Sequence, residues 1–206
     1  MGFLFDLLML MIAVAVVAFL YGEGIWSNTI MLINTVLAGL LAMNLFEPLA
    51  GWLEEMVPAM QLAWDFVCLW VVFVVTVVVL RLLTDRISRV RVRFLKLVEQ
   101  IGSPAVGLLV AMVVVSFTVT TLHTAPLGTT FMWGGFDPDK RMVLGTAPDR
   151  NWLAFTHYVS AGSLHRLDVE DGERVFDPNQ EFIRNYVAHR KEVESHLGTA
   201  DWFIVN

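Results

Sequence analysis

Four long apolar runs within the first 123 residues constrain the fold of this 206-residue chain more than any other feature. A bilayer core about 30 Å thick is crossed by a helix of about 20 apolar residues. Each run is about that long, and together they leave too little polar surface for a water-soluble helical domain. The sequence therefore predicts an all-α membrane protein with four spanning helices. The predicted spans are Phe3–Tyr21, Gly24–Phe46, Leu62–Leu83 and Ile101–Leu122.

The distribution of charge divides the chain into a membrane part and a tail. Residues 1–123 hold 6 of the 14 basic and 8 of the 20 acidic residues, whereas residues 124–206 hold the remaining 8 and 12. We therefore expect a membrane domain over residues 1–123, a linker over 124–145 and a small extramembrane domain over 146–206. The net charge of −6 argues against nucleic acid as a partner. A single cysteine, Cys68, excludes an internal disulfide and a multi-cysteine zinc site.

The basic residues of the membrane part predict its orientation. Arg81 lies near the end of the third span and the other five lie between the third and fourth spans, whereas the second loop, Glu47–Gln61, carries three glutamates and no Lys or Arg. Basic loops stay on the cytoplasmic side. We therefore expect a bacterial inner-membrane protein with both termini periplasmic. The first span lacks a basic region before it, so we interpret it as a retained helix rather than a signal peptide.

The basic loop also has helical periodicity. Apolar residues recur along one face of a 3.6-residue helix, and cations fill the opposite face. The apolar stripe is Ile87, Val90, Phe94, Leu97, Val98 and Ile101; the cations are Arg86, Arg89, Arg91, Arg93 and Lys96. This pattern favours an interfacial amphipathic helix that binds anionic lipid headgroups, with a simple extension of the third span as the alternative. We expect Gly102, Ser103 and Pro104 to break that helix and restart it as the fourth span.

Polar residues inside the spans are candidates for function. Asp6 and Asp65 each lie about one turn inside a span at the outer face. They could form a proton or cation site between the first and third helices, or they could face the positive ends of their helix dipoles. Asn34 in the second span could line a pore, but an amide in lipid more commonly hydrogen-bonds a neighbouring helix.

Small residues repeat at four-residue spacing in the fourth span, at Ser103, Gly107 and Ala111. Such spacing lets two helix backbones approach closely. The pattern indicates a packing face within the bundle or a face for self-association.

The tail is predicted to be a small, mainly helical α+β domain. Residues 146–149 have the form of a capping box for a helix that runs to about Ala161. Asp171-Gly172 is typical of a β-hairpin turn between residues 167–170 and 173–176. Asp177-Pro178 then begins a second helix that ends at Gly198. The apolar stripe of this helix is Phe182, Tyr186, Val193 and Leu197.

The tail carries residue types that are used in catalysis and metal binding, but their spacing matches no known catalytic or metal-binding motif. The nucleophile and base candidates are Ser160, Ser163, His157, His165 and Asp168, and the metal candidates are His189, Glu192 and His196. There is no Gly-x-Ser-x-Gly elbow, and the histidines border an apolar stripe. Phosphate-binding and dinucleotide glycine motifs are also missing from the sequence. We therefore predict no enzyme, no catalytic or metal site and no cofactor.

The order of features in the membrane part resembles the colicin V production (CvpA) family. The features are Asp6 in the first span, the closing glycines Gly22 and Gly24, a proline-containing outer loop, a valine-rich third span that ends in Arg81, and a glycine-containing fourth span. Residues 147–155 are similar to the segment that follows the membrane part in longer family members.

This resemblance implies a non-enzymatic inner-membrane protein that supports bacteriocin (colicin V) production or export and envelope homeostasis. We expect it to act as a scaffold, as a homo-oligomer or with envelope and export proteins as partners. The alternative is a small oligomeric channel or proton-coupled transporter that uses Asp6 and Asp65.

Overall fold

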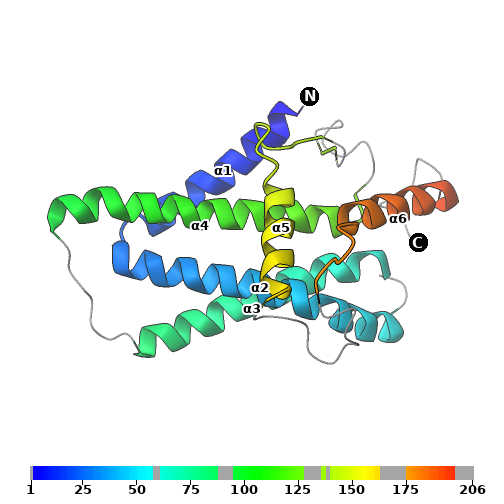
Figure 1. Cartoon of the computed structure of the whole chain (residues 1–206), viewed down its shortest axis with the longest axis horizontal. Coiled ribbons are helices and arrows are strands. Elements are labelled where there is room, and N and C mark those ends of the chain that lie inside the picture. Colours follow the sequence, from blue (N-terminus) through cyan, green and yellow to red (C-terminus); the bar gives the residue numbers. More distant parts are fainter. Residues whose placement is uncertain are drawn as a thin grey trace.

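The computed structural model describes residues 2–57, 61–87, 95–127, 136–137, 140–162 and 175–197. Six helices lie within these ranges and no strand does (Figure 1). In chain order they are α1 (Phe3–Leu20), α2 (Ile25–Met56), α3 (Gln61–Ile87), α4 (Lys96–Thr124), α5 (Pro148–Ser160) and α6 (Phe182–Leu197). The mainly helical character of the prediction is confirmed. The predicted hairpin around Asp171-Gly172 falls largely outside the described residues.

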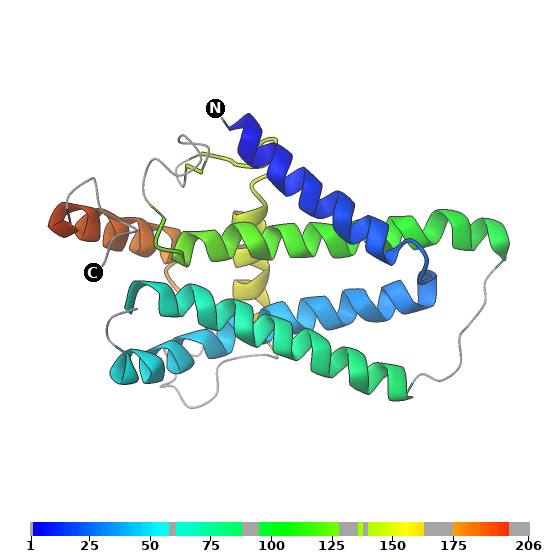
Figure 2. The same ribbon diagram turned by 180° about the vertical axis from the view of Figure 1, so that it is seen from behind.

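The first four helices are each long and apolar enough to cross a membrane, as the sequence predicts. The main contacts between them join α2 to α3, α1 to α4 and α2 to α4. The helices α1 and α3 consequently lie at opposite edges of the bundle (Figures 1 and 2). Large apolar side chains on both edges are exposed, for example Leu10, Val14, Val74 and Val78. This exposure is what lipid-facing helices require, because acyl chains solvate apolar side chains.

Two predicted boundaries of the spanning helices are wrong. The helix α2 continues to Met56 with Pro48 inside it, so most of the predicted second loop is helical. The helix α4 begins at Lys96 and passes through Gly102, Ser103 and Pro104 without a break. A proline removes one backbone N–H, but a spanning helix packed against neighbours can tolerate this loss.

The predicted interfacial helix is not confirmed as a separate element. Arg86 belongs to the last turn of α3 and Lys96 to the first turn of α4. Arg89, Arg91 and Arg93 lie outside the described residues. Ile101, the last residue of the predicted apolar stripe, lies within α4.

Aromatic side chains fill the centre of the bundle. The rings of Phe73 on α3 and Phe117 on α4 stack with centroids 4.3 Å apart, and Trp152 of α5 meets Phe117 edge-on at 6.2 Å. Gly39 on α2 makes room for Trp152, because a Cβ atom at this position would lie 2.5 Å from Cζ2 of the indole. As a result α5 crosses α4 and α2 instead of running along them (Figure 1).

A second core lies between α1, α4 and the segment predicted as a linker. Phe5 and Met9 of α1 are buried together with Phe136 and Met142. The rings of Phe5 and Phe136 have centroids 5.8 Å apart. The described part of residues 124–145 is therefore packed on the bundle.

The N-termini of the two tail helices are capped differently. The predicted start of α6 at Asp177-Pro178 is wrong, because α6 begins at Phe182. Asp177 still caps it from outside, since its two carboxylate oxygens accept the backbone N–H groups of Glu181 and Phe182 at 2.8 and 3.1 Å. The predicted capping box of α5 is wrong. Its N-cap is Ala147, in the left-handed region with no side-chain cap, and Asp149 is used elsewhere.

Candidate functional site

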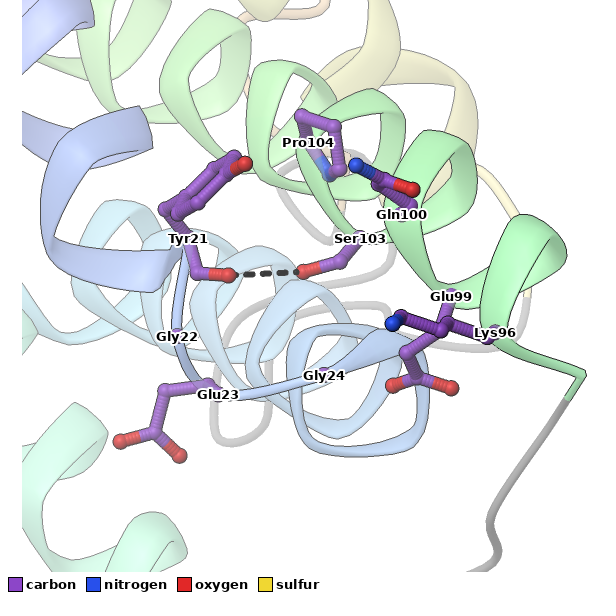
Figure 3. Close-up of a pocket in the computed structure, with 9 residues that line it drawn as sticks. All are labelled: Tyr21, Gly22, Glu23, Gly24, Lys96, Glu99, Gln100, Ser103 and Pro104. Carbon is purple, nitrogen blue, oxygen red and sulfur yellow. Dashed lines mark hydrogen bonds between the residues drawn. The ribbon is translucent and has the colours of Figure 1, made fainter.

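The bundle has two ends, and each carries a group of polar contacts. The turn end holds residues 21–24, which connect α1 to α2, and the tail end holds α5 and α6. A cavity of about 510 Å³ opens at the turn end (Figure 3). Its lining residues are Tyr21, Gly22, Glu23, Gly24, Lys96, Glu99, Gln100, Ser103 and Pro104.

Glu99 fastens this turn to α4. Its Oε1 atom accepts the backbone N–H of Ile25 at 2.9 Å, which satisfies one of the unpaired donors at the start of α2. Gly24 has a φ of +88°, and a Cβ there would lie 2.5 Å from Oε1 of Glu99. The positive φ therefore favours glycine at position 24, and a Cβ there would also displace the Glu99 carboxylate from its bond to Ile25. Glu23 points away from the cavity in Figure 3 and pairs with Arg81 at 3.0 Å.

Asn28 joins three helices beneath the turn. Its buried amide nitrogen donates to the carbonyl oxygen of Leu20 at 3.1 Å and to the backbone and side-chain oxygens of Ser103 at 3.0 and 3.1 Å. Ser103 in turn donates to the carbonyl of Tyr21 at 3.4 Å. These bonds position the end of α1, the start of α2 and the start of α4 together.

The predicted small-residue face lies against this junction. Ser103, Gly107 and Ala111 are all buried. A Cβ at Gly107 would contact Leu20 and the backbone of Val17 on α1 at ordinary distances of 3.7 and 4.0 Å. The face therefore points into the bundle, toward α1, instead of outward toward a second copy.

At the tail end, His123 and Asp149 form a fully buried pair. Nε2 of His123 lies 3.0 Å from Oδ2 of Asp149, and both side chains have no exposed surface. Burial raises the pKa of Asp149, but the hydrogen bond and charge of His123 outweigh it, so this pKa lies below its usual range. Thr120 adds a bond of 3.4 Å to the backbone carbonyl of Asp149. The start of α5 is thereby fixed to the end of α4.

Both candidate aspartates contact the tail. Oδ2 of Asp65 on α3 accepts the phenolic O–H of Tyr186 on α6 at 2.7 Å. Oδ1 of Asp6 on α1 accepts the backbone N–H of Leu144 at 3.4 Å. The two carboxylates lie on helices at opposite edges of the bundle, and each meets a different part of the tail.

Asn34 connects two spanning helices. Its amide nitrogen donates to the hydroxyl of Thr84 on α3 at 3.2 Å, and Asn34 itself is buried. This is the interhelical role that an amide within a span most commonly has.

The catalytic and metal candidates of the tail are placed only in part. Ser160 is buried, donates to the carbonyl of His157 and accepts the N–H of Phe176. Nδ1 of His157 contacts the carbonyls of Phe176 and Asp177 at 3.0 and 3.1 Å. Both side chains thus hold the backbone between α5 and α6. Ser163, His165 and Asp168, and the side chains of His189, Glu192 and His196, lie outside the described residues.

Three important residues were missed as site candidates at the sequence level. His123, Asp149 and Glu99 make the contacts that fasten the tail and the turn. His123 had a signal, because a histidine in the last turn of an apolar span needs a buried partner. Nothing in the sequence pattern indicated which acidic residue would supply it. Among the described residues, no group of three or more His, Cys, Asp or Glu side chains could hold a metal ion.

Four helices of spanning length with apolar outer edges define a multi-pass membrane protein. Its sequence matches the family described as Colicin V production protein over residues 5–134, more than half of the chain. The chain therefore belongs to this family, as the resemblance in its sequence indicates. The match includes all four spanning helices and leaves α5 and α6 outside it. No curated protein and no solved structure shows significant similarity to the chain.

Proposed function

We propose that this protein is a non-enzymatic scaffold of a bacterial inner membrane that supports bacteriocin production or export and envelope homeostasis. The proposal rests on family membership together with one structural observation: the tail is docked on the spanning helices. Buried contacts from Asp149 and Trp152 hold α5, and Tyr186 holds α6. A docked tail presents its outer surface to partners in one fixed orientation, which lowers the entropy cost of binding them.

The orientation proposed here has the tail and both termini in the periplasm. The support is the positive-inside rule, since Arg81, Arg86 and Lys96 all lie at the turn end. A cysteine at the exposed Tyr158 should then react with a membrane-impermeant maleimide in intact spheroplasts, and a cysteine at Arg86 only after lysis. The background is Cys68→Ala, which removes the buried native thiol. The reverse pattern would place the tail in the cytoplasm.

The partners are envelope or export proteins, or further copies of the chain. A photo-crosslinking amino acid at Tyr158, which is 77% exposed on α5, should capture specific partners in living cells. The same group at Val78, on the outer edge of α3, is the control and should react with lipid. Capture of no protein from position 158, with the variant inserted and stable, would contradict the scaffold proposal.

The contacts of Asp6 and Asp65 favour a role in holding the tail on the bundle over a role in ion coupling. Asp6 and Asp65 each bond to the tail from opposite edges of the bundle. In liposomes we expect no proton flux from the purified protein, and the same result for the Asp6→Asn and Asp65→Asn variants. Proton flux that both substitutions abolish would favour the transporter alternative.

A further inference from the structure

A cavity of about 540 Å³ between α5 and α6 combines cations with an apolar floor. One side comes from α5, and the other comes from residues 177–191. The cations among its lining residues are Arg150, Arg184 and Lys191; the larger apolar residues are Leu153, Ile183 and Val187. None of the site contacts described above fills this cavity.

The charge balance around the cavity favours an anion. Among the described lining residues, Asp177 is the one carboxylate, and it caps the N-terminus of α6. Glu181 pairs with Arg184 at 3.2 Å on an exposed surface, where an ion pair contributes little. His157 also lines the cavity, and its Nδ1 atom is occupied by the backbone. The described lining therefore holds three cations and one carboxylate, which favours an anionic ligand.

The cavity also lies at a defined depth in the bundle. The exposed pair of Arg81 and Glu23 marks one border of the apolar slab at the turn end. Gly39, which contacts Trp152 of α5, is 14 residues along α2 from Ile25, or about 21 Å. The apolar core of a bilayer is about 30 Å thick. Gly39 thus lies about 9 Å inside the far border. The helix α6 lies beyond α5 on the side away from the turn end (Figure 1), so the cavity between them faces that border.

We propose that this cavity binds the headgroup of an anionic phospholipid, a glycerophosphodiester such as phosphatidylglycerol. The phosphate is held by the guanidinium and ammonium groups, which are the usual protein partners of phosphate. The glycerol and the first acyl carbons cover the apolar floor. A bound lipid of this kind links α5 to α6 and ties the tail to the membrane surface.

The test uses the full-length protein in a neutral detergent and measures binding by native mass spectrometry. The probes are dioctanoyl phosphatidylglycerol, dioctanoyl phosphatidylcholine and sn-glycerol 3-phosphate. We expect the double variant Arg184→Gln/Lys191→Gln to bind phosphatidylglycerol at least tenfold more weakly, given the usual contribution of each cation at a lipid surface. The control is Lys140→Gln/Arg141→Gln, which removes two exposed cations elsewhere in the tail and should leave the affinity unchanged.

A second variant tests the role of the cavity's space without removing any of its charges. Ala154 is exposed on α5 and lines the cavity, so Ala154→Trp should obstruct it and weaken binding with every cation retained. Melting temperatures close to that of the wild type verify that the variants fold. Equal affinity for phosphatidylcholine, or an equal loss in the control pair, would overturn the proposal. Binding of glycerol phosphate as tight as that of the lipid would overturn it in favour of a soluble phosphate ligand.

Discussion

Tyr186 and Asp65 stand 121 positions apart in the chain, and the phenol of the first donates a 2.7 Å hydrogen bond to the carboxylate of the second. Burial raises the pKa of Tyr186, and the negative charge of Asp65 raises it further. The phenol therefore stays protonated and remains a donor at every physiological pH. The bond fixes α6, which lies outside the spanning bundle, to the start of α3.

Removing either partner of this bond should loosen α6. We expect Tyr186→Phe and Asp65→Ala each to lower the stability of the docked tail by about 1.5 kcal/mol, the low end for a bond to a charged group, because both residues are only partly buried. The measurement is the rate of limited proteolysis between α5 and α6 in nanodiscs. In the double variant the two effects should overlap. Full additivity would mean that the residues act independently.

Gly39 should be the most sensitive glycine in α2. Gly39→Ala places a Cβ against the buried indole of Trp152 and should cost about 1–3 kcal/mol through overpacking. Gly51 is a matched control in the same helix, because a Cβ there meets nothing within 4 Å. Gly51→Ala should be neutral or stabilise the helix by up to about 1 kcal/mol. Thermal unfolding in detergent compares the two, and equal melting temperatures would show that α5 does not rest on Gly39.

The spans were predictable from the sequence because an apolar run of 20 residues has few alternatives. Their ends were harder to predict. The segment Glu47–Met56 reads as a loop from its glutamates and Pro48, yet its apolar face packs on α3 and keeps it helical. Gly102 and Pro104 are typical helix breakers. Here Gly102 leaves room for the side chain of Ile25 on α2, because a Cβ at position 102 would lie 2.5 Å from Cδ1 of Ile25.

Docking of α5 should depend on pH through Asp149. The folded pKa of this carboxyl is lower than its unfolded value of about 4, so ionised Asp149 contributes stability that is fully present above about pH 4. That stability is lost as the pH falls through the lower, folded pKa. We expect tail proteolysis to accelerate over this acid range in the wild type. Asp149→Asn should be destabilised by about 1–3 kcal/mol at pH 7 and should lack the acid-dependent step. An identical acid response in both proteins would remove Asp149 as its cause.

The turn between α1 and α2 provides a second matched pair of glycines. Gly24→Ala forces a Cβ into a φ of +88° and to within 2.5 Å of Glu99, so it should destabilise the protein by about 1–3 kcal/mol. Gly22→Ala meets nothing within 4 Å and should be neutral. Melting temperatures in detergent compare them. A similar loss for both would contradict this account, because the positive φ and the contact with Glu99 would then not distinguish Gly24 from Gly22.

The polar contacts were less predictable than the spans because each joins residues far apart in the chain. Asp6 and Asp65 stood out as carboxylates in apolar helices, but their partners, Leu144 and Tyr186, could not be recognised without the fold. Asp149 occupies the last position of the predicted capping box, so the sequence predicts that its side chain caps α5 itself. Burial beside His123 overrides that local role.

The central claim is that the tail is docked on the spanning bundle in one orientation. The most direct test is a pulsed electron-paramagnetic-resonance distance between spin labels at Tyr158 on α5 and Trp52 on α2, both exposed, in the Cys68→Ala background in nanodiscs. We expect a single narrow distance distribution that broadens when Gly39→Ala is added. A broad distribution in the protein without that substitution would contradict the account, because it would mean that the tail is tethered to the bundle and not fixed to it.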